Sequence, residues 1–556
     1  MQGLKEGHGN TPAMHADSYD YIIVGGGTAG CVLASRLTED PGVTVLLLEA
    51  GGKDGAMLIR IPAGWTQAML DPKLAWVHQT MPASALRDRS MVMPRGKVMG
   101  GSSSINGLVY VRGQPEDFDG WAAAGARGWS WKEVLPYFMR GEDWSGASVT
   151  GRGKGGPLKV SPGFEPSRFG EVLMEGVRQY GLPINPDYNG ASQEGVGWVQ
   201  LTGRDHRRWS AADAYLKPAM TRPNLRVALN ALATRVLFEG KRAVGVEYLQ
   251  DGRRIQVKTR REVLLAAGAV RSPQLLMLSG IGPGAQLQSF GIPVLADRDG
   301  VGSNLQDHLV LVMGWQFKPG GPSHNPNLSG WRLVREVLRF MLFKKGAMNM
   351  SVGDVMLFFK SNPDLPRPDV QVHCLPVTGD VETKHATGEN LPHKEPGMTL
   401  APCDMRPRSR GHVSLASADP AALANVDPRY LSDEEDWKVV LAAVAILRQL
   451  ARAPALAALI ECELYPGAQH LSEAKLREAL IHISTTGHHP VGTCRMGSDA
   501  AAVLDPELRV RGVDGLRVVD ASVMPCLPSG NTNAPTFMIA ERASDLIRGR
   551  QPLLAH

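Results

Sequence analysis

The sequence lacks several features that would place it in a specialised class of protein. Its six cysteines lie far apart and include no Cys-x-x-Cys pair, so we expect neither a disulfide framework nor a metal site. Unpaired cysteines suit a reducing compartment, and we therefore expect a cytoplasmic location. Aromatic residues make up only 6% of the chain, and no aromatic cage for a quaternary ammonium group is visible among them.

Charge of one sign and long apolar runs are also missing. The 60 Lys and Arg residues exceed the 55 Asp and Glu residues by only five over a length of 556, and no block of like charges predicts a nucleic-acid partner. Residues 1–17 form a polar N-terminal tail without the apolar core of a signal peptide. The longest apolar helical stretch, Val439–Leu447, ends at Arg448 and is too short to span a bilayer. No transmembrane segment is expected.

Glycine, by contrast, is abundant and well placed near the start of the chain. The apolar run Asp20–Val24 is typical of a buried parallel strand and leads directly into Gly25-x-Gly27-x-x-Gly30. The segment Cys31–Leu37 then has helical apolar spacing. In this context the first glycine permits a tight turn, the second lets backbone approach a pyrophosphate, and the third allows close packing of helix on strand. The pattern predicts a dinucleotide site.

A second buried run, Val43–Leu48, completes a strand–turn–helix–strand unit and ends at Glu49. A carboxylate at this strand end can accept hydrogen bonds from ribose hydroxyl groups, and it would repel a 2′-phosphate. The motif does not distinguish NAD from FAD.

The rest of the chain alternates between strand-like and helix-like segments and predicts an α/β protein. We expect sheet strands at Leu225–Val227, Ala233–Phe238, Ala243–Leu249, Glu262–Ala267 and Leu516–Val519, and a helix over Ser272–Ser279 that begins with Ser272 as cap and Pro273 in the first turn. Strand-like runs at Val355–Phe359 and Val370–Val377 lack the βαβ rhythm and indicate a second, mainly antiparallel sheet facing the substrate.

These segments predict two domains assembled from separated pieces of chain. A Rossmann-like cofactor domain is expected from residues 18–160, 215–313 and 485–550, and an α+β substrate domain from residues 161–214 and 314–484.

Three further clusters carry candidate chemistry. Residues 95–107 hold paired glycines and three serines, which suit either a buried backbone nest or a flexible surface loop. Residues 487–497 contain the adjacent His488 and His489, of which one can face a site while the other packs. Asn531 and Asn533 precede a helix expected over Phe537–Ile547 and are either caps or a polar wall against a ligand.

Together these motifs resemble the glucose-methanol-choline (GMC) flavoprotein oxidoreductases, and in particular the choline dehydrogenase-like alcohol dehydrogenases and oxidases of bacteria. The resemblance rests on the glycine turn with Glu49, on residues 96–106, 268–282 and 301–308, and on the C-terminal His and Asn motifs. It extends from Asp20 to about Ile547 and is weakest between Gly314 and Leu400.

The resemblance implies that the cofactor is FAD. The residues it places on FAD are Gly25, Gly27, Thr28, Ala29, Gly30, Glu49, Trp76, Met99, Gly101, Ser102, Asn106, Gly107, Leu108, Val109, Val236, Asp520, Ala521, Asn531, Thr532 and Asn533. Ile105 stands where relatives with covalently attached FAD have a histidine, and this implies a non-covalent cofactor.

The implied reaction is oxidation of a primary alcohol, aliphatic, aromatic or furanic, to an aldehyde by hydride transfer to flavin N5. His489 matches the family's catalytic base and Asn531 its polar partner. Choline dehydrogenase or oxidase activity is an alternative, and so is a non-redox activity of the same fold, either hydroxynitrile lyase or fatty-acid photodecarboxylase. Photodecarboxylases lack the histidine, whereas the lyases keep it. The electron acceptor is either O2 or a quinone.

One amphipathic segment, Trp331–Phe343, is followed by Lys344 and Lys345. We expect a lid or core helix with a solvated basic face. Peripheral contact with a membrane, which would let a quinone accept electrons, is the alternative.

Overall fold

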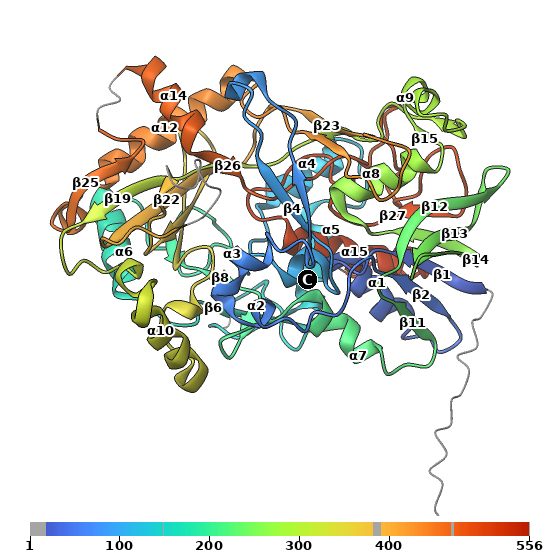
Figure 1. Cartoon of the computed structure of the whole chain (residues 1–556), viewed down its shortest axis with the longest axis horizontal. Helices are drawn as coiled ribbons and strands as arrows, with labels where there is room; N and C mark the ends of the chain where they lie inside the picture. Colours follow the sequence, from blue (N-terminus) through green and yellow to red (C-terminus); the bar gives the residue numbers. More distant parts are fainter. Residues whose placement is uncertain (1–17, 148, 382–390, 469–471, 555–556) are drawn as a thin grey trace, which may run out of the picture.

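The computed structural model describes residues 18–147, 149–381, 391–468 and 472–554. Two sheets frame it, one at each end of the long axis in Figure 1, and each is assembled from separated stretches of chain. This arrangement agrees with the expected fold class. The domain boundaries remain a prediction. Strand β18 (Leu309–Leu311) pairs in the second sheet, although it falls inside the segment 215–313 that we assigned to the cofactor domain.

The first sheet has the order β11-β2-β1-β14-β13-β12, and β27 also pairs with β14. Its strands are β1 (Ser18–Val24), β2 (Val45–Leu48), β11 (Leu225–Ala228), β12 (Leu232–Glu239), β13 (Arg242–Gln250), β14 (Arg253–Leu265) and β27 (Leu516–Val518). β11, β2, β1, β14 and β27 run parallel, whereas β12, β13 and β14 form an antiparallel meander. The long strand β14 therefore joins a nucleotide-binding type of sheet to the meander.

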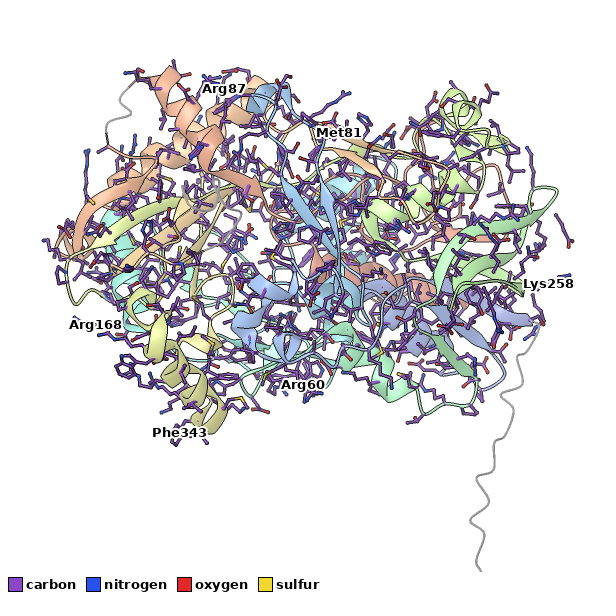
Figure 2. All side chains as sticks on the ribbon, in the orientation of Figure 1. Arg60, Met81, Arg87, Arg168, Lys258 and Phe343 are labelled. Atoms are coloured by element: carbon purple, nitrogen blue, oxygen red, sulfur yellow. The ribbon has the colours of Figure 1, made fainter. Side chains whose placement is uncertain are left out.

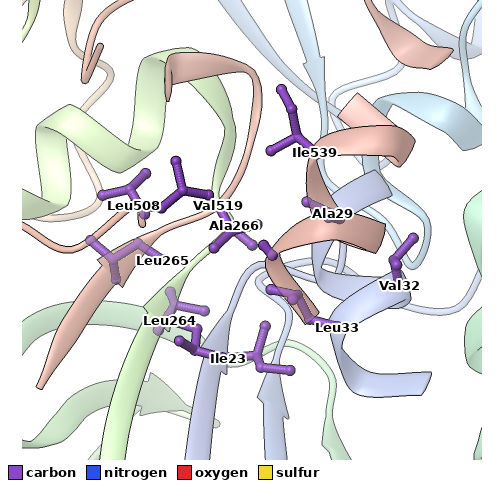
Figure 3. Packing of buried hydrophobic residues seen from close by; sticks show 14 of the residues in the cluster. Ile23, Ala29, Val32, Leu33, Leu264, Leu265, Ala266, Leu508, Val519 and Ile539 are labelled. Carbon is purple, nitrogen blue, oxygen red and sulfur yellow. The ribbon is translucent and has the colours of Figure 1, made fainter. Parts of the chain in front are cut away.

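Two helices, α1 (Thr28–Leu37) and α15 (Asn533–Ile547), pack beside each other on this sheet. Figure 3 shows Leu33 of α1 close to Ile23 and Leu264 of the strands, with Ile539 of α15 nearby. Each such buried side chain contributes about 1.5–3 kcal/mol. The packing holds the N-termini of both helices at the same edge of the sheet.

The second sheet is antiparallel throughout and has the order β25-β19-β22-β21-β20-β7, with β18 paired to β22 and β26. Its strands are β7 (Gly195–Trp198), β18 (Leu309–Leu311), β19 (Met313–Phe317), β20 (Val355–Phe359), β21 (Val370–Leu375), β22 (Gly397–Asp404), β25 (Ile460–Tyr465) and β26 (Ser484–Thr486). Helices α6 (Arg168–Tyr180) and α12 (Glu434–Leu450) bury apolar side chains in the same core cluster as these strands.

Further elements lie outside the two sheets. They include α2 (Met57–Arg60), α3 (Trp65–Ala68), β3 (Ala75–Gln79), β4 (Val92–Gly96), α4 (Pro115–Ala123), α5 (Trp131–Gly141), α7 (Lys217–Ala219), α9 (Gly284–Ser289), α13 (Pro454–Ala457) and α14 (Glu473–Ile483). The two strands β3 and β4 form a hairpin that crosses the middle of the molecule (Figure 1).

The helix expected over Ser272–Ser279 is present but spans Gly268–Leu278 (α8), so only its predicted start and cap were wrong. The Ser272 hydroxyl donates to Asp520 Oδ2 instead of capping the helix. Pro273, which has no N–H, leaves the carbonyl of Ala269 without its usual helical donor. The Thr493 hydroxyl donates to that carbonyl at 2.6 Å. A contact distant in sequence thus permits proline inside the helix.

Helix α15 likewise begins at Asn533, four residues before the predicted Phe537, and Thr532 is its N-cap residue without a side-chain cap. Asn531 and Asn533 are therefore not caps, which leaves the alternative of a polar wall.

The amphipathic segment forms α10 (Gly330–Phe343), which projects at the lower left of Figure 1. Only Glu336 and Phe340 are buried on it, while most of its large apolar side chains are exposed. The prediction of a core helix was wrong, because no described segment covers this apolar face. Across the described ranges, no helix is both long and apolar enough to cross a membrane.

Candidate active site

A cavity of about 1160 Å³ lies between the two sheets. Its walls are formed by the carboxyl edge of the first sheet, the N-termini of α1 and α15, and the strands β18 and β21. The predicted site residues that line it are Gly25, Gly27, Thr28, Ala29, Glu49, Trp76, Gly101, Ser102, Asn106, Gly107, Leu108, Val109, His489, Asp520, Ala521, Asn531, Thr532 and Asn533. Gly30, Met99 and Val236 do not line it.

The glycine turn is shaped by close backbone contacts. Gly25 has φ of +105°, and a Cβ atom there would lie 2.5 Å from the Ala266 carbonyl oxygen. A Cβ at Gly30 would lie 1.9 Å from the Gly25 oxygen, whereas one at Gly27 meets nothing closer than 3.9 Å. Gly25 and Gly30 therefore permit tight packing, and Gly27 leaves its side of the cavity open for a ligand.

Glu49 closes the turn from the second strand. Its two carboxylate oxygens accept hydrogen bonds from the backbone N–H groups of Gly26 and Gly51, each at 2.8 Å. Burial raises the pKa of Glu49 to about 7, although these two hydrogen bonds oppose the shift. Each oxygen has a second lone pair and can still accept from a ribose hydroxyl.

The N-termini of α1 and α15 converge on the same wall. The Thr28 hydroxyl donates to Asn533 Oδ1 at 2.9 Å and ties the two helix starts together. The Asn533 side-chain nitrogen is buried and has no hydrogen-bond partner among the described residues. Two helix N-termini, an unsatisfied amide donor and an open glycine position suit the pyrophosphate of FAD. The cavity residues thus fit this cofactor.

The segment 99–109 is buried rather than a flexible surface loop. The 3₁₀ turn Gly101–Ser104 touches the glycine turn, since the Gly100 N–H donates to the Gly26 oxygen at 2.8 Å. Asn106 Oδ1 accepts from Arg208 Nη1 at 2.7 Å. Arg208 is buried, and burial lowers its pKa to about 9. We did not predict Arg208, and its sequence neighbourhood gave no signal.

His489 and Asn531 come together from opposite parts of the fold. His489 follows strand β26 of the second sheet, and Asn531 precedes α15 on the first. The Asn531 side-chain nitrogen lies 2.9 Å from His489 Nε2. Gln371 of β21 donates to the Asn531 oxygen at 3.0 Å, which orients the amide so that its nitrogen faces the histidine. Nε2 must therefore be unprotonated and accept this hydrogen bond.

His308 fixes the other nitrogen of the His489 ring. The two Nδ1 atoms lie 2.9 Å apart, and His308 Nε2 lies 3.2 Å from the Met405 carbonyl oxygen. A carbonyl can only accept, so the proton of neutral His308 is on Nε2 and its Nδ1 accepts. His489 then carries its proton on Nδ1 and presents a lone pair at Nε2.

Burial sets the charge of this histidine pair. Desolvation lowers the pKa of His489 well below the ordinary value, and His308 adds to the shift. Burial also lowers the pKa of His308 to about 4. Both rings are therefore neutral at pH 7, and His489 is competent as a base.

Asp307 anchors the loop that carries His489. Its Oδ1 accepts from the backbone N–H of His489 at 2.6 Å, and its Oδ2 accepts from the hydroxyls of Thr486 and Tyr430. His488 has a left-handed backbone (φ +63°), and its carbonyl accepts from Arg95. These contacts give the two adjacent histidines different partners, but both residues line the cavity, contrary to the expectation that one faces a site while the other packs.

The sequence held signals for several residues that we did not assign to the site. Asp307 and His308 lie in the matching stretch 301–308, and Gln371 and His373 occupy alternate positions of β21, so they share a face. His373 lines the cavity, and burial lowers its pKa to about 4. In the described part of the chain, no three His, Cys, Asp or Glu side chains gather to hold a metal ion.

Comparison with known proteins gives consistent results. Sequence profiles of GMC oxidoreductases match residues 19–310 and 407–540. The chain is 43% identical over 533 residues to an alcohol dehydrogenase (acceptor) of Pseudomonas putida, with 95% of each chain covered. It is 41% identical to the mitochondrial choline dehydrogenase of Homo sapiens, covering 97% of this chain and 91% of the other. Among solved structures, pyridoxine 4-oxidase from Mesorbium loti aligns with a TM-score of 0.86 at 32% identity, with 96% and 100% of the two chains covered.

Proposed function

This chain belongs to the GMC oxidoreductase family, and we propose that it oxidises an uncharged primary alcohol to an aldehyde with His489 as the base. It is an FAD-dependent oxidoreductase acting on CH–OH donors. When bound, FAD supplies the oxidant that takes two electrons from the alcohol carbon. The observation that carries the assignment of the base is the contact between neutral His489 Nε2 and the Asn531 amide nitrogen.

His489 and Asn531 act on different atoms of the substrate hydroxyl group. A substrate hydroxyl displaces the Asn531 N–H from His489 Nε2, donates its proton to that nitrogen, and accepts with its oxygen from the Asn531 nitrogen. A hydroxyl is a weak acid, so removing its proton and stabilising the resulting oxygen charge are needed together. The neutral amide donates without adding a charge that would hold substrate or product electrostatically.

The lining of the cavity on the substrate side favours an uncharged alcohol. Apolar side chains from the second sheet and the segment before β20 dominate it, namely Val310, Val312, Met348, Met350, Val352, Leu375 and Val377. Such a surface binds aliphatic or aromatic carbon and leaves orientation to the few polar groups.

Choline is the alternative substrate, and two lining residues favour it. Trp65 offers an aromatic face and Asp380 a carboxylate, the two groups that hold a quaternary ammonium. The 41% identity to a protein named choline dehydrogenase points the same way.

A panel of alcohols tests the substrate class. The purified yellow protein is titrated without oxygen with aliphatic, aromatic and furanic alcohols and with choline, and loss of flavin colour is followed. Bleaching by uncharged alcohols with little effect of choline is expected, and preferential bleaching by choline would reverse the assignment. Air is then admitted, because fast recolouring identifies O2 as acceptor and slow recolouring favours a quinone.

The role of the base is tested by His489→Ala and Asn531→Ala. Both variants are expected to keep bound flavin, because neither residue forms the pyrophosphate wall. Loss of the base is expected to slow flavin reduction by about 10²- to 10⁴-fold in rapid mixing. Undiminished reduction in His489→Ala would eliminate His489 as the base.

Two further predictions rest on the sequence. The flavin is held without a covalent bond, since Ile105 lines the cavity where attachment would need a histidine, and acid precipitation that releases all flavin into the supernatant checks this. The cytoplasmic location also remains a prediction.

A further inference from the structure

Helix α10 presents three distinct faces around its axis. At about 100° per residue, Trp331, Val334, Leu338 and Leu342 fall on one arc, and all four are exposed, Trp331 to 68% and Leu342 to 72%. Met341 extends this apolar surface and is exposed, and Phe343, also exposed, lies beyond the arginines at the end of the helix. Figure 2 shows Phe343 at the projecting tip. Single exposed apolar residues are ordinary, but a continuous arc over a whole helix marks an interaction surface.

Basic residues border this apolar arc. Arg332, Arg335 and Arg339 fall on the adjacent arc and are exposed, and Lys344 and Lys345 follow the helix. The only acidic residue in 330–345, Glu336, is buried and accepts from the Ala347 N–H at 3.2 Å. It also lies 3.7 Å from Arg335 and 3.8 Å from Arg339, so it offsets part of their charge, while Arg332, Lys344 and Lys345 leave the segment with a net positive charge. Glu165, an acidic neighbour, accepts from the Gly346 N–H at 3.0 Å. The exposed part of the helix is therefore apolar and cationic.

The inward-facing arc of α10 lines the cavity. Leu333 and Val337 line it, as do Leu328 before the helix and Met348 after it. Leu70 and Leu391 also line the cavity and are each 46% exposed, so it reaches the surface there. Helix α10 is thus a wall with the cavity on one side and an uncovered apolar face on the other.

We propose that α10 docks this protein on the surface of an anionic phospholipid bilayer. The apolar arc enters the boundary between headgroups and acyl chains, with Trp331 at the interface, and the arginines and lysines contact anionic headgroups. Each basic residue near such a surface contributes to binding through the negative surface potential. Pairing with a second copy of the helix would bring five basic residues against five, so charge complementarity favours lipid.

Docking in this orientation has a functional consequence. The wall that separates the cavity from solvent would instead separate it from the lipid, where apolar alcohols and quinones concentrate. Because the docking surface lies outside the catalytic pair, binding to lipid and alcohol oxidation are measured separately.

Flotation of the full-length, FAD-loaded protein with vesicles tests the proposal. We expect binding to vesicles of phosphatidylcholine mixed with phosphatidylglycerol, weaker binding to phosphatidylcholine alone, and loss of binding at high salt. The double variant Leu338→Glu/Leu342→Glu is expected to bind at least about ten-fold more weakly, since it removes apolar burial and adds negative charge. Leu423→Glu/Leu554→Glu, which makes the same two changes at exposed leucines outside α10, serves as the matched control and should bind as the unaltered protein does.

Two further measurements separate the outcomes. Alcohol oxidation with a water-soluble dye as acceptor should be equal in the double variant and the control, which shows that both are folded and active. Failure of the unaltered protein to float with the anionic vesicles, or equal flotation of the double variant, would overturn the proposal. So would a dimer in light scattering that the double variant converts to a monomer without any vesicle binding, because a second copy would then be the occupant.

Discussion

At the scale of single residues, the tautomer of His489 follows from a short chain of hydrogen bonds that has a donor, the Gln371 amide, at one end and an acceptor, the Met405 carbonyl, at the other. The Met405 carbonyl fixes His308, His308 fixes Nδ1 of His489, and Gln371 orients the Asn531 amide that faces Nε2. Each link has one allowed donor direction, so the lone pair at Nε2 is set before any substrate arrives. A base that is already in the correct tautomer requires no rearrangement during the reaction.

The depressed pKa of His489 predicts the pH dependence of the reaction. Protonation of Nε2 removes the base, and burial shifts this protonation below the ordinary value of about 6.5. The rate of flavin reduction at saturating alcohol should therefore be constant through neutral pH and fall only in acid. Stopped-flow measurement of flavin reduction across the pH range gives this fall of the rate in acid, the acid limb of the pH profile. A limb centred above pH 7 would contradict a buried, neutral base.

Replacing Asn531 by aspartate should move that limb in a known direction. A carboxylate beside Nε2 stabilises the imidazolium and raises the pKa of His489. The acid limb of Asn531→Asp is therefore expected at higher pH than that of the unaltered protein, in the same stopped-flow measurement. A limb that stays in place would mean that the two side chains do not interact in the working enzyme.

His308 is a positioning residue in this arrangement. In His308→Leu the Nδ1–H of His489 loses its acceptor, and moving the proton to Nε2 becomes favourable, so we expect reduction to slow by about 10- to 100-fold. His308→Asn offers an amide oxygen as a substitute acceptor and should retain most of the rate. Flavin content and thermal midpoints of both variants distinguish loss of tautomer from loss of fold, and equal rates in the two variants would contradict the role.

At the scale of elements, α8 shows why local sequence predicted the helix but not its start. Ser272 and Pro273 form a favoured cap and first turn, yet the helix begins at Gly268. The deciding interaction is the hydrogen bond from Thr493, which is 224 residues away along the chain. Tertiary contacts of this kind are not contained in a local pattern, and the same holds for the Arg208 contacts to Asn106.

A double-mutant cycle tests this account of α8. Thr493→Val leaves the Ala269 carbonyl without a donor and should destabilise the protein by about 1–3 kcal/mol. In a Pro273→Ala background the restored N–H can serve that carbonyl, so the same change should cost less. Denaturant unfolding of the four proteins gives the coupling, with Thr493→Ser as the control that keeps the hydroxyl. Equal costs in both backgrounds would mean that Thr493 stabilises the fold in another way.

At the scale of the whole molecule, the sequence predicted strands in both sheets where apolar runs are separated by clear turns, but of the long strand β14 it predicted only the apolar end, because the first half is charged. The glycine turn and Glu49 could be predicted from a motif with its own chemistry, whereas His489 and Asn531 could be singled out only through the resemblance to GMC oxidoreductases. The sequence did not predict that Gln371 reaches Asn531 or that His308 reaches His489, since those contacts depend on antiparallel pairings between distant strands. Periodicity showed that α10 has an apolar face, but whether another segment covers that face is decided only by tertiary packing.

The cofactor should act as a structural part of the molecule, since its cavity lies between the two sheets. Protein stripped of FAD is expected to melt at a lower temperature, and FAD at 100 times its dissociation constant should restore about 2.7 kcal/mol of stability. Gly30→Ala should not gain this stabilisation, because the added Cβ would lie 1.9 Å from the Gly25 oxygen and force the turn apart. Gly120→Ala adds a methyl group where no atom lies within 4 Å and is the matched control. Thermal melts of the unaltered protein and the two variants, with and without FAD, measure this stabilisation. If FAD stabilised Gly30→Ala as fully as Gly120→Ala, binding of the cofactor would not depend on this turn.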